Sequence, residues 1–298
     1  MPRLRSSRAG AVERHTPAAS PPAWHPPAAP GPDRDLRGLF GAIAGGYDAA
    51  NHLLSAGLDH RWRSRAAAAT GARPGDTVLD VCCGTGDMTL AVLKRMGGRG
   101  HLIGCDFSRP MLRRARAKLA AAGLQRRATL LEATAEAIPL ADAAVQAAVC
   151  AFGLRNLADP KRGLREMARV VRPGGRVTIL EFHRPAPPAG RPQHACRARG
   201  RSPATNGSPR HQAPSPRPSP TKGRGRVRLA ALGLYFRRIL PTLGRWLSAT
   251  DAYEYLAASI EAFGPSQATA ALMRDAGLAE VRVEPLPGGI AAVYVGHV

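Results

Sequence analysis

The chain has 298 residues, enough for one large α/β domain with a substantial hydrophobic core. Hydrophobic residues make up 44% of the composition, as in globular proteins, and no apolar run is long enough to span a bilayer. The net charge of +22 raises the question of nucleic-acid binding. Much of the positive charge lies in residues 186–228, which hold ten Lys or Arg and no acid. The rest of the chain is therefore much less basic than the total suggests, and nucleic acid is not favoured as a partner.

Regular structure is predicted to begin near residue 36. Residues 1–35 are rich in Pro, Ala and Arg and lack apolar periodicity, which predicts a disordered basic arm. Residues 36–70 follow a helical pattern. Beyond them, apolar runs typical of strands alternate with helical patterns. Strands are expected at 77–82, 101–106, 128–132, 145–151 and 175–182, helices at 87–96, 108–122 and 160–171, and two closing strands in AEVRVEPL and GIAAVYVG.

This alternation predicts an α/β fold in which a mostly parallel sheet is covered by helices. Residues 186–228 interrupt the pattern with nine prolines and no core-forming residues. We interpret them as a disordered Pro/Arg-rich insertion, so that residues 36–185 and 229–298 form one domain. The charge run is either simply solvated or attracted to anionic lipid or RNA.

The cysteines give no sign of a metal centre or of a disulfide framework. No two of them form a C-x-x-C pair or have zinc-ligand spacing, so we expect no metal site and a reduced, cytoplasmic protein. They are Cys82, Cys83, Cys105, Cys150 and Cys196.

The most informative segment is TVLDVCCGTGDMT, residues 77–89. An apolar run ends in Asp80, and a tight turn follows at Gly84-Thr85-Gly86, where glycine allows a ligand to approach the backbone closely. The next helix begins there and offers free N–H groups. A second apolar run, HLIGCD, ends in Asp106, whose carboxylate can accept both hydroxyls of a ribose. The unit predicts a nucleoside-binding β-α-β.

The dinucleotide cofactors are the alternative for such a unit. Their fingerprint has a third glycine, and Thr89 stands at that position, which argues against NAD or FAD. A Gly-x-Gly sequence alone would be weak, but its combination with Asp80 and Asp106 at strand ends is specific.

Several further segments in the right order resemble the ubiquinone/menaquinone biosynthesis C-methyltransferase family. They are FGAIAGGYDAANHLLSAGLDHRWR (residues 40–63), the nucleoside motif, residues 135–182 with the distinctive FGLRN, residues 240–260, and the C-terminal MRDAGLAEVRVEPLPGGIAAVYVG. The resemblance implies a Rossmann-like class I methyltransferase with a seven-stranded, mostly parallel sheet and helices on both faces. It also implies S-adenosylmethionine as the methyl donor.

The resemblance assigns the donor site residue by residue. It implies that Asp106 holds the ribose and that Thr134 and Ala135 flank the adenine. Family members often carry Ser before FGLRN, whereas this chain has Ala151, so a hydroxyl contact to the donor is lost. The remaining donor contacts are expected from the loop after the first strand: Asp80, Gly84, Thr85 and Gly86.

The implied reaction is methylation of a ring carbon of a polyprenylated quinol, either demethylmenaquinol or 2-methoxy-6-polyprenyl-1,4-benzoquinol. Loss of the phenolic proton activates the ring carbon, and positioning for in-line attack supplies much of the rate. Arg155 and Asn156, in FGLRN, are expected to hold a quinol oxygen. The proton acceptor stays open: His60 titrates in a suitable range, but a structural role in its helix is the alternative.

The substrate's isoprenoid tail implies work at a membrane surface. Residues 226–247 combine arginines with Leu, Phe and Trp, and we expect peripheral contact with the inner face of the membrane. A complex with other quinone-biosynthesis enzymes is a further expectation. The alternatives are a methyltransferase of the same fold acting on another small lipid, a basic nucleic-acid binder, and a methyl-donor binder inactivated by the insertion.

Overall fold

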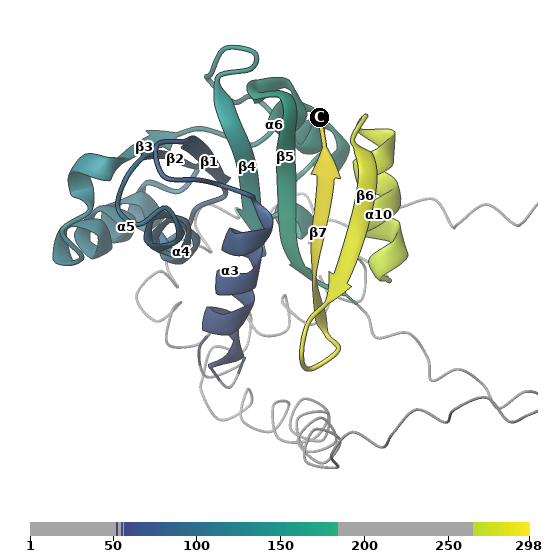
Figure 1. Ribbon diagram of the computed structural model, residues 1–298, viewed down its shortest axis with the longest axis horizontal. Helices are drawn as coiled ribbons and strands as arrows, with labels where there is room; N and C mark the ends of the chain where they lie inside the picture. Colours follow the sequence, from purple (N-terminus) through teal and green to yellow (C-terminus); the bar gives the residue numbers. More distant parts are fainter. Residues whose placement is uncertain (1–51, 53–54, 56, 184–264) are drawn as a thin grey trace, which may run out of the picture.

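The computed structural model describes residues 52, 55, 57–183 and 265–298, and it shows one twisted sheet with helices packed against it (Figure 1). The strands are β1 (Thr77–Val81), β2 (His101–Asp106), β3 (Ala128–Glu132), β4 (Val145–Ala151), β5 (Val171–Phe182), β6 (Ala279–Pro285) and β7 (Ala291–His297). The helices are α3 (Leu58–Ala69), α4 (Asp87–Arg95), α5 (Arg109–Ala121), α6 (Pro160–Val170) and α10 (Ser266–Asp275), with short 3-10 turns η1 (Gln125–Arg127) and η2 (Leu154–Asn156).

The strand order is β3-β2-β1-β4-β5-β7-β6, and β7 runs antiparallel to both of its neighbours. The predicted seven-stranded, mostly parallel sheet is therefore confirmed. From β3, at one edge, the chain crosses to β4 on the far side of β1, so β1 and β4 flank a topological switch point. In open α/β sheets, ligands bind outside the carboxyl ends of the strands at such a point.

Two hydrophobic clusters cover the two faces of the sheet, which confirms the predicted helices on both sides. One cluster joins α3, α4 and α5 to the sheet through side chains such as Trp62, Val92 and Leu119. The other joins α6 and α10 to the opposite face through Leu164 and Met273. The central strands pack against helices on both faces, which explains why most residues of β1 and β4 are apolar.

The predicted boundaries differ from the structure mainly at β5. The sequence predicts a sharp turn at residues 173–175 before a strand at 175–182, but β5 already begins at Val171, which pairs with Val145. The register then shifts, and Arg176 pairs with Ala147. The Pro-Gly-Gly segment is therefore an irregularity inside the strand, and α6 ends at Val170 because Val171 has entered the sheet.

Several sequence predictions lie outside the described residues: the basic arm at 1–35, the insertion at 186–228 and the segment 226–247. Within the described residues, no helix combines the length and the apolar character needed to cross a bilayer.

Candidate active site

The Asp106 carboxylate organises the loop at the carboxyl edge of the sheet. Its Oδ2 atom accepts a hydrogen bond from the Gly84 backbone N–H at 2.9 Å, and its Oδ1 atom accepts one from Ser108 at 2.8 Å. The side chain is 7% exposed, and this burial raises the pKa of Asp106, while the two N–H donors partly oppose the shift. Each oxygen has a further lone pair, so the carboxylate can still accept ribose hydroxyls.

The two glycines of the turn serve different purposes. A side chain at Gly84 would come no closer than 4.0 Å to the Cys82 carbonyl, so the space beside this backbone is open to a ligand. A side chain at Gly86 would lie 3.1 Å from Ala115 Cβ, so this glycine lets α5 pack closely against the turn. Gly84 therefore has the property that the donor-site prediction requires, whereas Gly86 has a packing role as well.

Thr85, between the two glycines, is buried and is held from α5. Its hydroxyl accepts a hydrogen bond from Lys118 Nζ at 3.0 Å. The same ammonium group forms an ion pair at 2.5 Å with Asp87, the first residue of α4. Lys118 thus fixes the turn against the start of the helix, a role that the sequence did not reveal because α5 lies about thirty residues farther along the chain.

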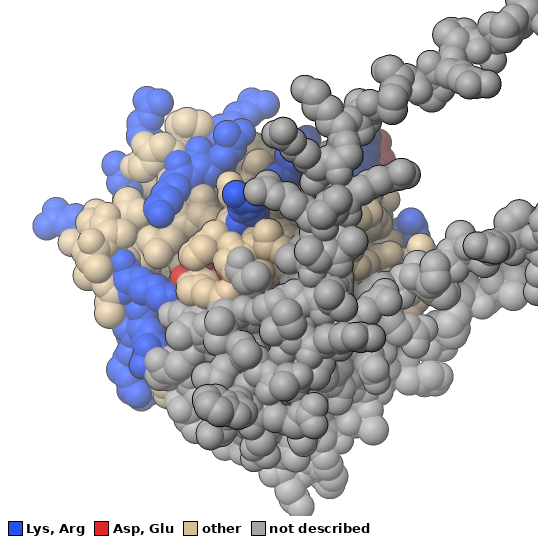
Figure 2. Space-filling view, turned by 90° about the horizontal axis from the view of Figure 1, so that it is seen from below, with Lys and Arg blue, Asp and Glu red and all other residues tan. Residues whose placement is uncertain are grey.

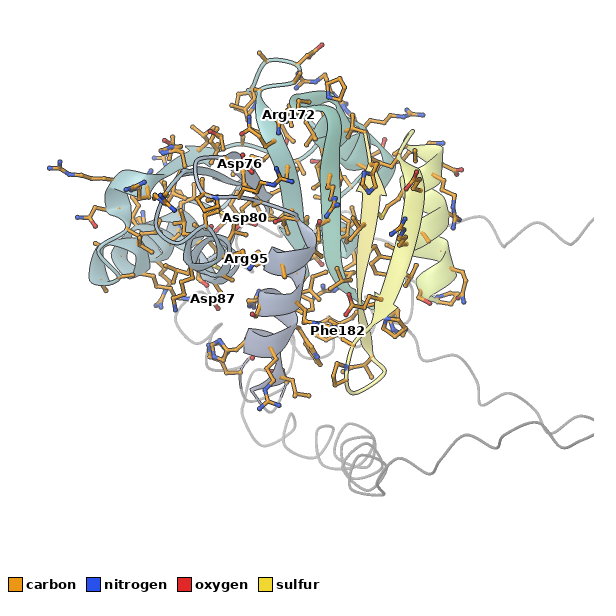
Figure 3. The ribbon with its side chains drawn as sticks, in the orientation of Figure 1. Asp76, Asp80, Asp87, Arg95, Arg172 and Phe182 are labelled. Carbon is orange, nitrogen blue, oxygen red and sulfur yellow. The ribbon has the colours of Figure 1, made fainter. Side chains whose placement is uncertain are left out.

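Asp80 lies in β1, before the loop, and is fully buried. Figure 3 shows it between Asp76 and Asp87. Its Oδ2 atom accepts the Thr89 hydroxyl at 2.7 Å, and its Oδ1 atom has no hydrogen-bond partner among the described residues. Burial raises the pKa of Asp80 to about 7, while Thr89 and the positive charge of Arg63 oppose that shift. Thr89 therefore anchors this carboxylate to α4.

The ends of β1 and β4 carry backbone strain at the switch point. Cys82 has φ 57° and Phe152 has φ 59°, both in the left-handed region that side chains disfavour. Between them lies Gly153, where an added Cβ would sit 2.5 Å from Cys82 Cβ. The glycine of FGLRN is thus required by the close packing of two strand ends.

Arg155 of FGLRN is buried and forms an ion pair with Glu181, near the end of β5. Its Nη1 atom lies 2.6 Å from Glu181 Oε1 and also donates to the Phe152 carbonyl at 2.7 Å. The guanidinium lies 5.5 Å from the centre of the Phe182 ring. Asn156 is half-buried and donates to the same Phe152 carbonyl over a long 3.4 Å contact. The structure therefore brings Arg155 and Asn156 together at the strained loop.

Aromatic rings form the wall beside this loop. Phe152 and Phe182 stack at 4.6 Å between ring centres, and Trp62 from α3 meets Phe182 edge-on at 6.1 Å. Figure 3 shows Phe182 at the lower end of the sheet beside α3. The Trp62 indole N–H donates to the Pro287 carbonyl at 3.1 Å. Trp62 therefore belongs to the core, and α3 is fixed against the loop that carries Arg155.

The three other predicted donor contacts lie at neighbouring strand ends. Ala151 is the last residue of β4 and is half-buried. Thr134 is exposed and Ala135 is buried, in the loop after β3, whose backbone is tied to β2 through Ala133 N–H and the Asp106 carbonyl at 3.2 Å. They occupy the β2–β3 side of the site, as expected of residues that flank the base of a nucleoside.

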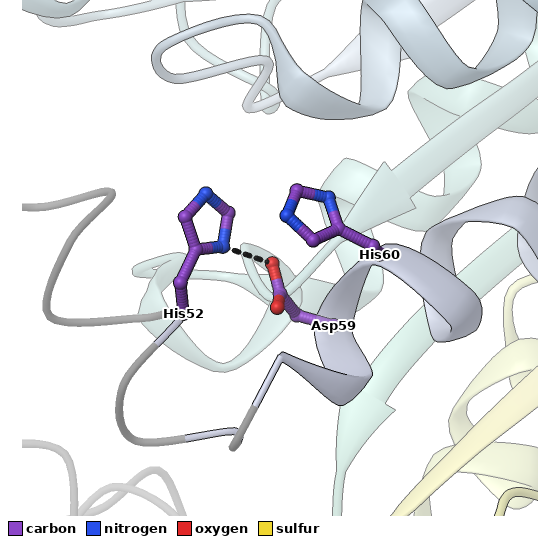
Figure 4. Close-up of side chains that lie close together, drawn as sticks. All are labelled: His52, Asp59 and His60. Carbon is purple, nitrogen blue, oxygen red and sulfur yellow. Dashed lines mark hydrogen bonds and ion pairs between the residues drawn. The ribbon is translucent and has the colours of Figure 1, made fainter.

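His60 lies at the first turn of α3, exposed, and its ring stacks on His52 at 4.3 Å (Figure 4). Between them lies the buried Asp59, which accepts from His52 at 2.7 Å and from the Ser55 hydroxyl at 2.8 Å. The ligand atoms of the two histidines and Asp59 lie within 4.8 Å, but Asp59 also faces Arg63 at 3.7 Å. None of the described contacts joins His60 to Arg155 or Asn156.

The residues present fit an adenosyl methyl donor. Asp106 can accept further hydrogen bonds beside Gly84, where the space is open. Asp80, just before the same loop, has a carboxylate oxygen without a hydrogen-bond partner among the described residues. Sequence reasoning missed Glu181, Lys118 and Arg63. Glu181 could have been found, because ILEF places an acid near the end of a buried strand, the same signal that identified Asp80 and Asp106.

Comparisons with known proteins agree with this geometry. Residues 31–195 and 226–298 match the ubiE/COQ5 methyltransferase family. The chain is 39% identical over 263 residues to a demethylmenaquinone methyltransferase from Thermus thermophilus, covering 87% of this chain and 99% of that protein. It is 33% identical over 261 residues to a ubiquinone/menaquinone biosynthesis C-methyltransferase from a Geobacter species, covering 88% and 95%.

A solved structure has the same fold at low sequence identity. The putative methyltransferase that forms a complex with the Trm112 activator in Haloferax volcanii aligns with a TM-score of 0.52 at 16% identity, covering 87% of this chain and 96% of that one. The predicted family, enzyme class and methyl donor are confirmed. The chain belongs to the ubiE/COQ5 methyltransferase family, and it is a class I methyltransferase whose methyl donor is S-adenosylmethionine.

Proposed function

We propose that this enzyme methylates a ring carbon of a polyprenylated quinol, with demethylmenaquinol and 2-methoxy-6-polyprenyl-1,4-benzoquinol as the candidate substrates. The relatives named above act in menaquinone or ubiquinone biosynthesis. The observation that carries the proposal is that one switch point holds both the hydrogen-bonded Asp106–Gly84 unit, proposed to bind the ribose, and the FGLRN loop, in which Arg155 lies beside an aromatic wall.

S-adenosylmethionine, when bound, supplies an electrophilic methyl group. In our proposal Asp106 holds its ribose, the backbone at Gly84 borders its sulfur, and Thr134 and Ala135 flank its adenine. Ala151, at the end of β4, borders the donor without a hydroxyl. The positive charge that sulfur carries before the methyl leaves favours a site with few cations beside it, because repulsion would weaken donor binding.

Arg155 and Asn156 are proposed to hold the quinol oxygen as its proton leaves. A guanidinium stabilises the developing phenolate, and Glu181 keeps that guanidinium in place through the 2.6 Å contact. Phe152 and Phe182 offer apolar surface to a quinol ring. The exposed His60 side chain stacks on His52 and has no described contact with Arg155 or Asn156, which supports the structural role over the catalytic one. The proton is proposed to leave through water held near Asn156.

The proposal is tested by incubating the purified enzyme with labelled S-adenosylmethionine and each quinol, and identifying the product by mass. Transfer of one methyl group to ring carbon is expected for at least one quinol. Product with neither quinol, from an enzyme that still binds the donor, would favour the inactive methyl-donor binder. Product only with another small lipid would favour the same-fold alternative.

For the remaining organisation, we propose a cytoplasmic enzyme in which residues 186–228 are an insertion that the chemistry does not need. Support comes from the family match, which leaves out residues 196–225. The matched experiment replaces residues 190–225 by a short Gly-Ser linker. Activity within a few-fold of the full chain is expected, and loss of activity in a folded protein would contradict the proposal.

We also propose peripheral contact with anionic membranes. The segment 226–247 motivates it, and the described surface adds a second basic region: between residues 88 and 131 the only acid is the buried Asp106. Figure 2, a view of the carboxyl edge of the parallel strands, shows Lys and Arg gathered on the side that α5 occupies in Figure 1. Exposed arginines of this region include Arg113, Arg114 and Arg116.

Vesicle flotation tests this contact. Binding to anionic but not to neutral vesicles, weakened by salt, is expected because basic residues near the surface each contribute up to about 1 kcal/mol. Arg237→Glu/Arg238→Glu and Arg113→Glu/Arg114→Glu test the two basic regions separately. Equal binding by the wild type and both double variants would exclude an electrostatic contact through either region.

A further inference from the structure

The side chain of Arg63 is a buried cation whose hydrogen-bonding capacity is not used by the residues that the structure describes. It is 9% exposed, and its Nε atom has no hydrogen-bond partner there. The nearest carboxylates are Asp59 at 3.7 Å and Asp87 at 3.9 Å, both beyond hydrogen-bond length. We propose that Arg63 binds the α-carboxylate of S-adenosylmethionine, an inference that rests on the proposed donor site.

Arg63 lies between the two strand ends that flank the switch point. On one side it approaches Asp87, the first residue of α4, directly after the Gly84-Thr85-Gly86 turn. On the other side its guanidinium lies 5.2 Å from the centre of the Phe152 ring, which follows the last residue of β4. Its charge also acts on Asp80, at the end of β1, where it counteracts the rise in pKa. The guanidinium therefore sits beside the carboxyl ends of β1 and β4.

The orientation of the donor places its amino-acid end in this region. Adenine and ribose are assigned to the β3 and β2 ends, through Thr134, Ala135 and Asp106. The methyl group must face the acceptor loop after β4, so sulfur lies near the ends of β1 and β4. In the strand order β3-β2-β1-β4, the carbon chain beyond sulfur continues away from the adenine, toward α3. Among the described arginines of α3, Arg63 is the one that lies near both Asp87 and Phe152.

The neighbouring acids compensate the charge of Arg63 without occupying its N–H groups. Asp59 accepts from Ser55 at 2.8 Å and from His52 at 2.7 Å. Burial raises its pKa, but the Ser55 hydrogen bond, the positive charge of Arg63 and the His52 hydrogen bond together hold that pKa below the usual value. Asp87 is held by Lys118 at 2.5 Å. Both carboxylates thus have closer partners, while the planar guanidinium keeps a fork of donors suited to a second, bidentate carboxylate.

A purely structural role for Arg63 is the competing account. In that account the residue only stacks on Phe152 and links α3 to α4, and its loss would weaken every ligand of the site alike. The two accounts therefore differ in one measurable quantity, which is the preference of the enzyme for a ligand that carries the carboxylate.

The experiment measures, by calorimetry, binding of S-adenosylhomocysteine and of its decarboxylated analogue, which keeps the amine and the adenosine but lacks the carboxylate. We expect the wild type to prefer S-adenosylhomocysteine by about tenfold or more, the effect of losing charge-assisted hydrogen bonds. Arg63→Met should abolish the preference, mainly by weakening S-adenosylhomocysteine. Arg65→Met is the matched control, because Arg65 lies on the same helix, exposed, in an ion pair with Glu284, and should keep the wild-type preference.

Equal weakening of both ligands by Arg63→Met, or a wild type without preference, would overturn the inference. If Arg63→Met does not fold, Arg63→Lys decides: it keeps the charge but not the fork, so a preference reduced several-fold supports the inference and an unchanged preference opposes it. If the wild type binds neither ligand, the donor site itself fails, which separates failure of the proposed function from failure of this inference.

Discussion

The Nη1 atom of Arg155 lies 2.6 Å from Oε1 of Glu181, in an ion pair where Glu181 is fully buried and Arg155 nearly so. The pair links the FGLRN loop to the end of β5, and the Phe152 carbonyl shares the same guanidinium nitrogen. Removing the cation that is paired with a buried carboxylate is destabilising, because no water replaces the partner. The pair therefore sets the shape of the proposed acceptor side of the site.

Glu181→Ala is expected to lower the free energy of unfolding by about 3–5 kcal/mol, because it leaves Arg155 as a buried charge without its carboxylate. Chemical denaturation measures the effect. Glu284→Ala is the control, since it breaks the exposed Arg65–Glu284 pair and should cost less than about 1 kcal/mol. Similar losses in both variants would show that the buried pair is no more important than a surface one.

Arg155→Ala is expected to slow methyl transfer much more than it weakens donor binding, because the guanidinium is proposed to act on the quinol oxygen. Single-turnover rates and calorimetry with S-adenosylhomocysteine separate the two effects. The variant removes the guanidinium from the buried Glu181, which keeps the Phe182 backbone N–H as a donor at 2.9 Å, so its fold must be checked by thermal unfolding. A folded variant with nearly normal turnover would remove Arg155 from the proposed role.

Asp106→Asn is expected to weaken binding of S-adenosylhomocysteine at least tenfold. The amide can still accept one of the backbone N–H groups of Gly84 and Ser108, but it loses the charge that strengthens two ribose hydrogen bonds, each contributing roughly 1.5–3 kcal/mol. Calorimetry gives the affinity. Asp142→Asn, at the exposed ion pair with Arg169, is a control of equal charge change that should leave affinity unaltered.

Alanine substitutions at Gly84 and Gly153 should differ in their main effect, which is on donor binding at Gly84 and on stability at Gly153. Gly153→Ala forces a Cβ to within 2.5 Å of Cys82, so a marked loss of stability is expected. Gly84→Ala meets no atom closer than 4.0 Å, and its φ of 53° costs only about 1–2 kcal/mol in backbone strain. Its methyl group would instead fill the space proposed for the donor, so binding should suffer more than stability. Melting temperatures and donor affinities of both variants give the comparison.

The titration of Asp80 should appear in the pH dependence of stability. Its pKa is raised by burial to about 7 in the folded chain, from the ordinary 3.8 of an aspartate, so the folded state holds the proton more tightly than the unfolded state. The stabilisation is fully present below about pH 4 and is lost as pH rises toward 7. We therefore expect wild type to lose stability relative to Asp80→Asn across that window. Parallel pH profiles of the two proteins would contradict this assignment.

The α/β class, the order of the elements and the nucleoside motif can be predicted from the sequence, because these features depend on local patterns. Apolar runs ending in Asp80 and Asp106 predict strands whose acids meet at one edge, and the structure joins the two loops through the Gly84–Asp106 hydrogen bond. The strand at 145–151 was predicted with its observed bounds because all of its residues except Gln146 are apolar.

The partners of the polar side chains can be found only in the three-dimensional structure, because those contacts join residues far apart in the sequence. The pairing of Arg155 with Glu181 spans 26 residues, and the bond from Trp62 to Pro287 spans 225. Likewise, the Pro-Gly-Gly segment predicts a turn locally. Val171 before it and Arg176 after it both pair with β4, however, so the segment belongs to β5. The proposed role of Arg63 could not be predicted from the sequence either, because its place in the helical pattern is that of any arginine. Its burial beside Asp87 and Phe152, seen only in the structure, is what suggests that it binds a ligand.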